Sequence, residues 1–189
     1  MNSGINNLES NSFYNKNELD NLGLNCFGDN VLISKKVSIY NSNKITIGNN
    51  VRIDDFCILS GNIYIGNNIH IAAGCMLFAG DVGITIKDYS GLSSRCAVYA
   101  VSDDYSGNYM TNSTVNSEYR NVISKEVVIE KHVVVGTGST ILPGVTIGEG
   151  CAIGAMSLVN KSLSPWNIYA GVPCRKIKER SKKLLDFIK

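Results

Sequence analysis

Few side chains in this sequence have the chemistry of a catalyst, and they fall at three places. The two histidines are His70 and His132, and an imidazole readily exchanges a proton near neutral pH. Two carboxylates, Asp103 and Asp104, stand together in the segment AVYAVSDDYSGNYM. Between positions 175 and 189, seven Lys and Arg residues stand against two acidic ones, which suits a local contact with phosphate groups.

The composition excludes several classes of protein. With 44% hydrophobic and 18% charged residues, the 189-residue chain is expected to fold and to be soluble. A net charge of +2 gives no reason to expect a nucleic-acid partner. No apolar run approaches a membrane span and the polar start MNSGINNLES is no secretion signal, so a cytoplasmic location is expected. The six cysteines show no CxxC spacing, so no metal site is expected.

The elements that must position these residues repeat every six residues. One uninterrupted run of aliphatic residues is Ile129, Val135, Ile141, Ile147, Ile153 and Val159. Similar runs bring the total to eighteen hexads, or about six coils if three hexads make a turn. The breaks at 39→47, 77→86 and 98→129 all follow a multiple of three hexads. All insertions are therefore predicted to leave from one corner of a triangular prism.

A second register, two residues before each repeat position, contains small or β-branched side chains. It includes Cys57, Cys75 and Cys96, which are predicted to stack inside the prism as inert core residues. Gly and Asn at many turn positions supply the positive φ that tight corners need. The pattern predicts an all-β fold, a parallel β-helix with a large corner loop over 99–124.

Both ends of such a column need a cap. Residues 1–26, with the helix-like NKNELDNLG, are predicted to cap one end of a β-helix domain spanning 27–172. Residues 173–189 are predicted to form a C-terminal α-helix, because four residues give them an apolar face: Ile177, Leu184, Leu185 and Ile188.

The stretch from Val127 to Lys178, VVIEKHVVVGTGSTILPGVTIGEGCAIGAMSLVNKSLSPWNIYAGVPCRKIK, resembles the C-terminal half of hexapeptide-repeat acyltransferases. Its pattern is similar to that of galactoside and maltose O-acetyltransferases and of the acetyltransferases of bacterial surface polysaccharides. The resemblance implies a left-handed β-helix and a homotrimer, with acetyl-CoA as co-substrate between adjacent subunits.

The resemblance also implies roles for individual residues. Thr137 matches a position that contacts coenzyme A, and Ala155 one whose backbone faces the pantetheine arm. Asn160 and Lys161 match a Thr-Lys pair at the pantetheine and phosphate end, although Asn replaces Thr here. In the segment PCRKIK, two residues match basic positions near the nucleotide phosphates, namely Arg175 and Lys178.

In this family the general base is usually a histidine in the corner loop, and here the loop contains none. Asp103 and Asp104 stand at the corresponding place. They are candidates to accept a proton, to orient His70 or to bind an ammonium group, and loop capping is the structural alternative. His70 is expected to point outward from a strand, which makes it the better-placed catalytic candidate, whereas His132 lies at a corner.

An Asp with an ordinary pKa near 3.9 is a poor base for a sugar hydroxyl, whereas an amine is already partly nucleophilic. The sequence therefore favours acetylation of the amino group of an amino sugar, such as a nucleotide-linked one in surface polysaccharide biosynthesis. Tyr105 and Tyr109 are candidates for stacking on the acceptor. A sugar O-acetyltransferase and a non-catalytic β-helical scaffold remain alternatives. A carbonic anhydrase on the same coil is disfavoured, because its zinc needs three histidines.

Overall fold

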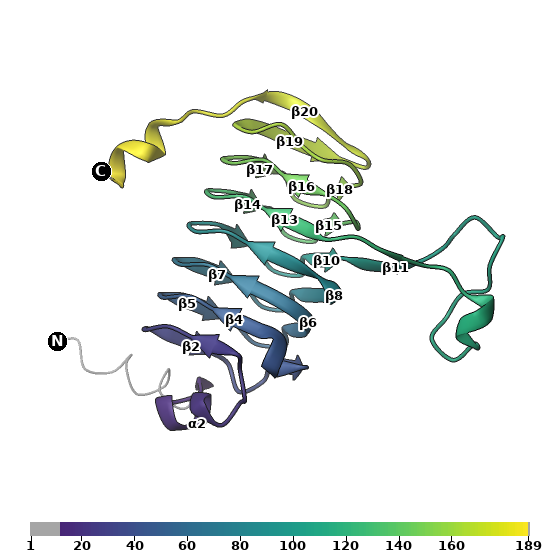
Figure 1. Ribbon diagram of the computed structural model, residues 1–189. Coiled ribbons are helices and arrows are strands. Elements are labelled where there is room, and N and C mark those ends of the chain that lie inside the picture. Colours follow the sequence, from purple (N-terminus) through teal and green to yellow (C-terminus); the bar gives the residue numbers. More distant parts are fainter. Residues whose placement is uncertain (1–11, 189) are drawn as a thin grey trace.

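The computed structural model describes residues 12–188, and over this range the chain forms a left-handed parallel β-helix (Figure 1). Its coils stack into a triangular column with three flat faces, here named A, B and C. Each corner of the triangle joins two of these faces. Face A consists of β2 (Val31–Ile33), β5 (Val51–Ile53), β7 (Ile69–Ile71), β9 (Gly91–Leu92), β14 (Val134–Val135), β17 (Ala152–Ile153) and β19 (Asn167–Gly171).

Faces B and C follow face A in each coil. Face B contains β3 (Ser38–Tyr40), β10 (Ala97–Tyr99), β15 (Thr140–Ile141), β18 (Leu158–Val159) and the first parts of β6 (Ile58–Ile65) and β8 (Met76–Ile86). Face C contains β1 (Cys26–Phe27), β4 (Ile45–Ile47), the last parts of β6 and β8, β13 (Val127–Ile129) and β16 (Thr146–Ile147). Because β6 and β8 run through the corner between faces B and C, these faces form one continuous sheet.

The register of the strands confirms the six-residue repeat. On face A, Ile53 pairs with Ile71 and Ile71 pairs with Leu92, so the predicted repeat positions lie directly above one another. The repeat residues from Ile47 to Val159 and the second register are buried, including Cys57, Cys75, Cys96 and the serines Ser90, Ser139 and Ser157. The column therefore has a continuous buried core built from the two predicted registers.

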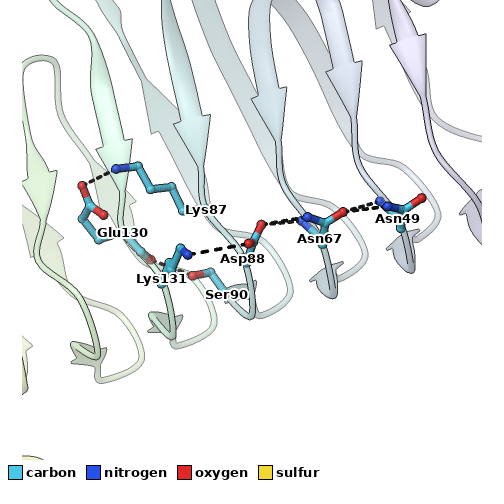
Figure 2. A network of polar contacts seen from close by, with 7 residues as sticks. All are labelled: Asn49, Asn67, Lys87, Asp88, Ser90, Glu130 and Lys131. Carbon is cyan, nitrogen blue, oxygen red and sulfur yellow. Dashed lines mark hydrogen bonds and ion pairs between the residues drawn. The ribbon is translucent and has the colours of Figure 1, made fainter. Parts of the chain in front are cut away.

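A ladder of polar side chains runs along the corner between faces C and A (Figure 2). The backbone N–H and side-chain amide of Asn49 both donate to Asn67 Oδ1, at 2.8 and 3.1 Å. Asn67 donates in the same way to Asp88 Oδ1, at 2.8 and 3.2 Å. Gly48 and Gly66 precede Asn49 and Asn67 and leave room for them, since a Cβ on Gly48 would lie 2.6 Å from Gly66 O and 2.7 Å from Asn67 Oδ1. The IGNN signature thus serves coil stacking as well as turn formation.

All three insertions leave from the corner between faces B and C, as the sequence predicts. The first is the 3₁₀ turn η1 (Ser42–Lys44), and the second is the bend within β8. The third is the loop over 99–124, which projects from the column in Figure 1 as a hairpin of β11 (Val101–Asp103) and β12 (Val122–Ser124) with η2 (Ser117–Tyr119) at its far part.

The N-terminal end of the column is covered by α2 (Lys16–Asp20), within the segment predicted to be helical. Asn15 and Glu18 form a capping box, and Leu19 is buried against the core. Residues 1–11 lie outside the described range, so the full extent of the predicted N-terminal cap stays a prediction.

The predicted C-terminal α-helix is wrong. Residues 174–179 instead form the strand β20 (Cys174–Glu179), which pairs antiparallel with β19, and only η3 (Lys183–Phe187) is helical, as a 3₁₀ turn. The physical reason is that β19 would otherwise present an unpaired edge at the end of the column. Leu184 and Leu185 are half-buried against the outside of the coil, so their apolar spacing reflects packing of an irregular segment.

The side chain of Arg180 fixes this segment to the column. Its Nη1 donates to the carbonyl oxygens of His132, Gly150 and Cys151 at 2.8–3.1 Å. Its backbone N–H donates to Trp166 O at 2.9 Å. The C-terminal segment thereby contacts three successive turns of the corner between faces C and A.

Replacing Gly48 by Ala tests the role of close coil stacking. The added Cβ has no room beside the next coil, and overpacking of this kind typically costs about 1–3 kcal/mol. We expect a lower thermal and urea midpoint for Gly48→Ala. Gly91→Ala is the matched control, because its Cβ would meet its nearest neighbour at an ordinary 3.5 Å. Equal stability of the two variants would contradict the close-packing argument.

Candidate functional site

The corner between faces A and B carries a column of small residues on the coils nearest the C-terminus. Thr137 Oγ1 donates to Ser94 O at 2.6 Å, and Met156 N donates to Thr137 O at 2.8 Å, so the turns stack directly. Ala155 is exposed on the turn after β17. A Cβ on Gly136 would lie 2.5 Å from Ala155 N, which shows how closely the turns approach. The result is a closely stacked edge on which Ala155 and Met156 are exposed, and it can be followed by an extended ligand arm.

The basic strand β20 lies at the C-terminal end of this edge. Arg175 pairs with Ala170 and Lys178 pairs with Ile168, and both partners are outward-facing positions of β19. Residues three apart in a regular strand point to opposite sides. A bulge in this pairing, where the register shifts between Ile168 and Tyr169, brings Arg175 and Lys178 onto the same side. Both residues are exposed.

Lys161 and Asn160 are exposed on the turn after β18. Burial raises the pKa of the Cys174 thiol, and the nearby positive charge of Lys161 partly opposes this. β18 belongs to face B and Leu163 bridges to Ile147 on face C, so this turn lies at the corner between faces B and C, whereas β20 pairs with β19 on face A.

His70 faces outward from β7, as predicted, and it has a partner that the sequence did not reveal. Its Nε2 lies 2.8 Å from Asp54 Oδ2, and Arg52 Nε donates to Asp54 Oδ1 at 2.7 Å. Partial burial raises the pKa of Asp54, but the hydrogen bonds from Arg52 and His70 outweigh it, so the net pKa is lowered. The available signal was the register itself, because Arg52 and His70 are paired neighbours on adjacent coils.

A shallow groove of about 400 Å³ lies beside His70. It is lined on face A by Gly91 and Val134 and at its edge by Tyr89 and His132. The His132 ring is buried and stacks on Tyr89 with a centroid distance of 5.2 Å. This packing gives His132 a structural place in the corner between faces C and A.

The two candidate carboxylates lie on the projecting loop and are already hydrogen-bonded there. Asp103 Oδ2 accepts from Asn112 N at 3.1 Å. Asp104 accepts from Ser106 N at 2.7 Å and from Asn121 Nδ2 at 2.8 Å, and these bonds lower its pKa. Both side chains thus hold the loop in shape, as the structural alternative predicted.

Within one chain the site residues are not gathered in one place. The loop leaves at the corner between faces B and C, whereas His70 and the small-residue edge lie on face A and at its junction with face B (Figure 1). Tyr105 and Tyr109 on the loop are exposed, Tyr105 to 88%. Of the residues proposed for the cofactor, Thr137 and Ala155 share one corner, and the two basic residues of β20 share one side of that strand. Asn160 and Lys161 lie at the corner between faces B and C, so a single chain does not bring the whole set together.

Within residues 12–188 no cluster of three or more His, Cys, Asp or Glu side chains could hold a metal ion. Among the same residues no helix is long and apolar enough to cross a membrane.

Known proteins resemble this chain both in its hexapeptide repeats and over most of its length. Residues 44–79 and 126–161 match the bacterial transferase hexapeptide family, in its six-repeat form. A dTDP-4-amino-4,6-dideoxy-D-glucose acyltransferase of Escherichia coli is 46% identical over 172 residues, covering 89% of each chain. The galactoside O-acetyltransferase of Escherichia coli K12 is 41% identical over 73 residues, covering 37% of this chain and 36% of that protein.

Solved structures of the N-acyltransferase AntD from Bacillus cereus are similar over nearly the full length. A serine-to-cysteine variant, in complex with dTDP-4-amino-4,6-dideoxyglucose and coenzyme A, has a TM-score of 0.92 and 52% identity, covering 94% of this chain and 95% of that one. AntD with dTDP and 3-hydroxybutyryl-CoA has a TM-score of 0.92 and 53% identity, covering 94% of both chains. With its hexapeptide coils, its basic terminal strand and these full-length relatives, the chain belongs to the hexapeptide-repeat acyltransferase family.

Proposed function

We propose that this protein transfers an acetyl group from acetyl-CoA to the amino group of a nucleotide-linked amino sugar. The observation that carries the proposal is the likeness, over 94% of the chain, to an N-acyltransferase bound to a dTDP-linked amino sugar and coenzyme A. The loop without a histidine supports the same reaction, because an amine acceptor needs less help from a base than a hydroxyl. The acceptor class is therefore a dTDP-linked 4-amino-4,6-dideoxyhexose, and surface polysaccharide synthesis is its expected use.

The chemistry is an attack of the amine on a thioester. A new N–C bond forms at the acyl carbon, the C–S bond breaks, and the thiolate leaves with the electron pair. The proton lost by the nitrogen goes to water or to that thiolate, so no strong protein base is required. The protein's part is to hold the two reactants together, which lowers the entropic cost of reaction.

Most of the candidate residues have a place in this scheme. The edge with Thr137 and Ala155 holds the pantetheine arm, and Asn160 and Lys161, at another corner of the column, contact the cofactor at its phosphate end. Arg175 and Lys178, on one side of β20, bind the nucleotide phosphates of the cofactor. On the loop, Asp103 and Asp104 orient the amine while Tyr105 and Tyr109 pack on the acceptor.

The site becomes complete if chains associate as a homotrimer. The loop projects away from its own column, so a neighbouring column is needed to bring its carboxylates to a cofactor edge. Exposed apolar side chains on the loop, including Met110, Tyr119 and Val122, supply the surface for that contact.

The first prediction from the proposed function concerns the assembly of the chains. Light scattering at micromolar concentration should give three times the chain mass of 20.5 kDa. Charged replacements of Met110 and Val122 should weaken association and reduce activity together. A fully active monomer would contradict a shared site.

The second prediction concerns the cofactor phosphates. Replacing both Arg175 and Lys178 with Ala should raise the KM for acetyl-CoA by about tenfold or more, because a desolvated charge-assisted hydrogen bond is worth about 1.5–3 kcal/mol. The control is Lys176→Ala, which removes a charge at a position paired with the inward-facing Tyr169. The assignment fails if the double variant keeps the wild-type KM.

The third prediction concerns the base. His70→Asn should lower turnover on an amino sugar less than tenfold, and the rate should follow the titration of the amine itself. If the enzyme acts on a hydroxyl instead, the loss should reach about 10²–10⁴-fold, the usual contribution of a general base. Paired pH–rate profiles of wild type and variant, on amino and hydroxyl forms of one sugar, distinguish the two. A hundredfold loss on the amino sugar would show that His70 removes the proton.

A further inference from the structure

The corner loop carries a single cation. Among residues 99–124 the charged side chains are Asp103, Asp104, Glu118 and Arg120. Arg120 follows η2 directly, and its backbone N–H donates to Ser117 O at 3.2 Å. It therefore sits where the far part of the loop turns back toward the column.

Within residues 12–188 the guanidinium of Arg120 has no hydrogen-bond or ion-pair partner. Its Nε is buried without a hydrogen-bond partner, the one such side-chain N or O atom identified in the described part of the chain. Two of the other four arginines are engaged, since Arg52 binds Asp54 and Arg180 binds three carbonyl groups. A buried unsatisfied donor costs about 1–3 kcal/mol, so it calls for an explanation such as a ligand.

The carboxylates on the same loop do not neutralise this cation. Asp104 N donates to Asn121 O at 3.1 Å, so the chain carrying Arg120 runs beside the acidic pair. Yet Asp104 accepts from Ser106 N and Asn121 Nδ2, and Asp103 accepts from Asn112 N. No ion pair joins Arg120 to an acid within residues 12–188. Although the loop carries three acids and one cation, none of these acids pairs directly with the Arg120 guanidinium within the described residues.

We propose that Arg120 binds the diphosphate of the nucleotide-linked acceptor. The inference rests on the proposed function and adds the group that recognises the nucleotide part of the substrate. A guanidinium is planar and always charged, and its fork of N–H donors matches phosphate oxygens in a bidentate way. In this arrangement one loop binds both ends of the acceptor. Its carboxylates contact the amine, and Arg120 contacts the diphosphate.

The test measures binding of dTDP alone, without acyl-CoA, by titration calorimetry. Arg120→Ala should weaken dTDP binding by about tenfold or more, the size of one lost charge-assisted hydrogen bond. The dTDP affinity of Arg120→Lys should lie between those of the wild type and of Arg120→Ala, because an ammonium binds phosphate as a point charge. Lys125→Ala is the matched control, since it removes the same charge where the hairpin rejoins the column, and it should bind dTDP as the wild type does.

Kinetics separate recognition from damage to the loop. In Arg120→Ala the KM for the nucleotide-linked sugar should rise, while the KM for acyl-CoA and the rate with the free amino sugar stay unchanged. Unchanged dTDP affinity would overturn the proposal, and so would an equal loss of affinity for thymidine, which has no phosphate. If Arg120→Ala does not fold, the ratio of dTDP to thymidine affinities in Arg120→Lys carries the same test. A wild type that binds dTDP through Arg120 but acylates no amino sugar would refute the proposed function and leave this inference standing.

Discussion

Backbone hydrogen bonds along the column axis fix each coil on the next, and the rest of the structure follows from this constraint. Ile53, Ile71 and Leu92 lie in register although 18 and 21 residues separate them. An extra residue within a face would shift every side chain beyond it to the opposite side. Insertions are therefore confined to corners, and close stacking there demands glycine at Gly48, where the next coil leaves no room for a Cβ.

The three corners consequently differ in what they present. Between faces C and A, the ladder of Asn49, Asn67 and Asp88 uses side chains to join the coils. Between faces A and B, the turns stack closely and leave Ala155 exposed. Between faces B and C, the chain leaves the column as the 99–124 hairpin. Because the column separates these corners, a site that needs both this edge and the long loop is most simply built from two columns.

The six-residue periodicity predicted the part of the fold in which each coil is hydrogen-bonded to the next. It did not predict the C-terminal segment, where the stacking of coils ends. The interior registers, the single insertion corner and the outward direction of His70 all follow from spacing. The C-terminal segment does not, because Leu184 and Leu185 mimic a helical face while the open edge of β19 pairs with β20. The bulge in that pairing could not be read from the sequence either, although it places Arg175 and Lys178 on the same side.

Contacts between side chains on different coils were the second kind of feature that the sequence did not predict. The hydrogen bond between Asp54 and His70 joins residues 16 positions apart, and no local motif announces it. Arg120 was invisible for the opposite reason, since what distinguishes it is the lack of a partner for a buried Nε within residues 12–188. The sequence shows where the charged side chains lie along the chain, but their significance depends on which of them the fold has already neutralised.

The state of Asp104 connects the loop to the chemistry. Hydrogen bonds from Ser106 N and then Asn121 lower its pKa, so the carboxylate is ionised at neutral pH and accepts a proton reluctantly. Such a group is a poor base for a hydroxyl, but it retains lone pairs that can accept a hydrogen bond from an ammonium or amine. Its stabilising effect on the loop is present above the ordinary carboxyl pKa and is lost as pH falls through the lowered value. Above that pH range Asp104 carries a fixed negative charge. Such a charge can orient an amine, which does not need a strong base, but it is poorly suited to deprotonating a hydroxyl.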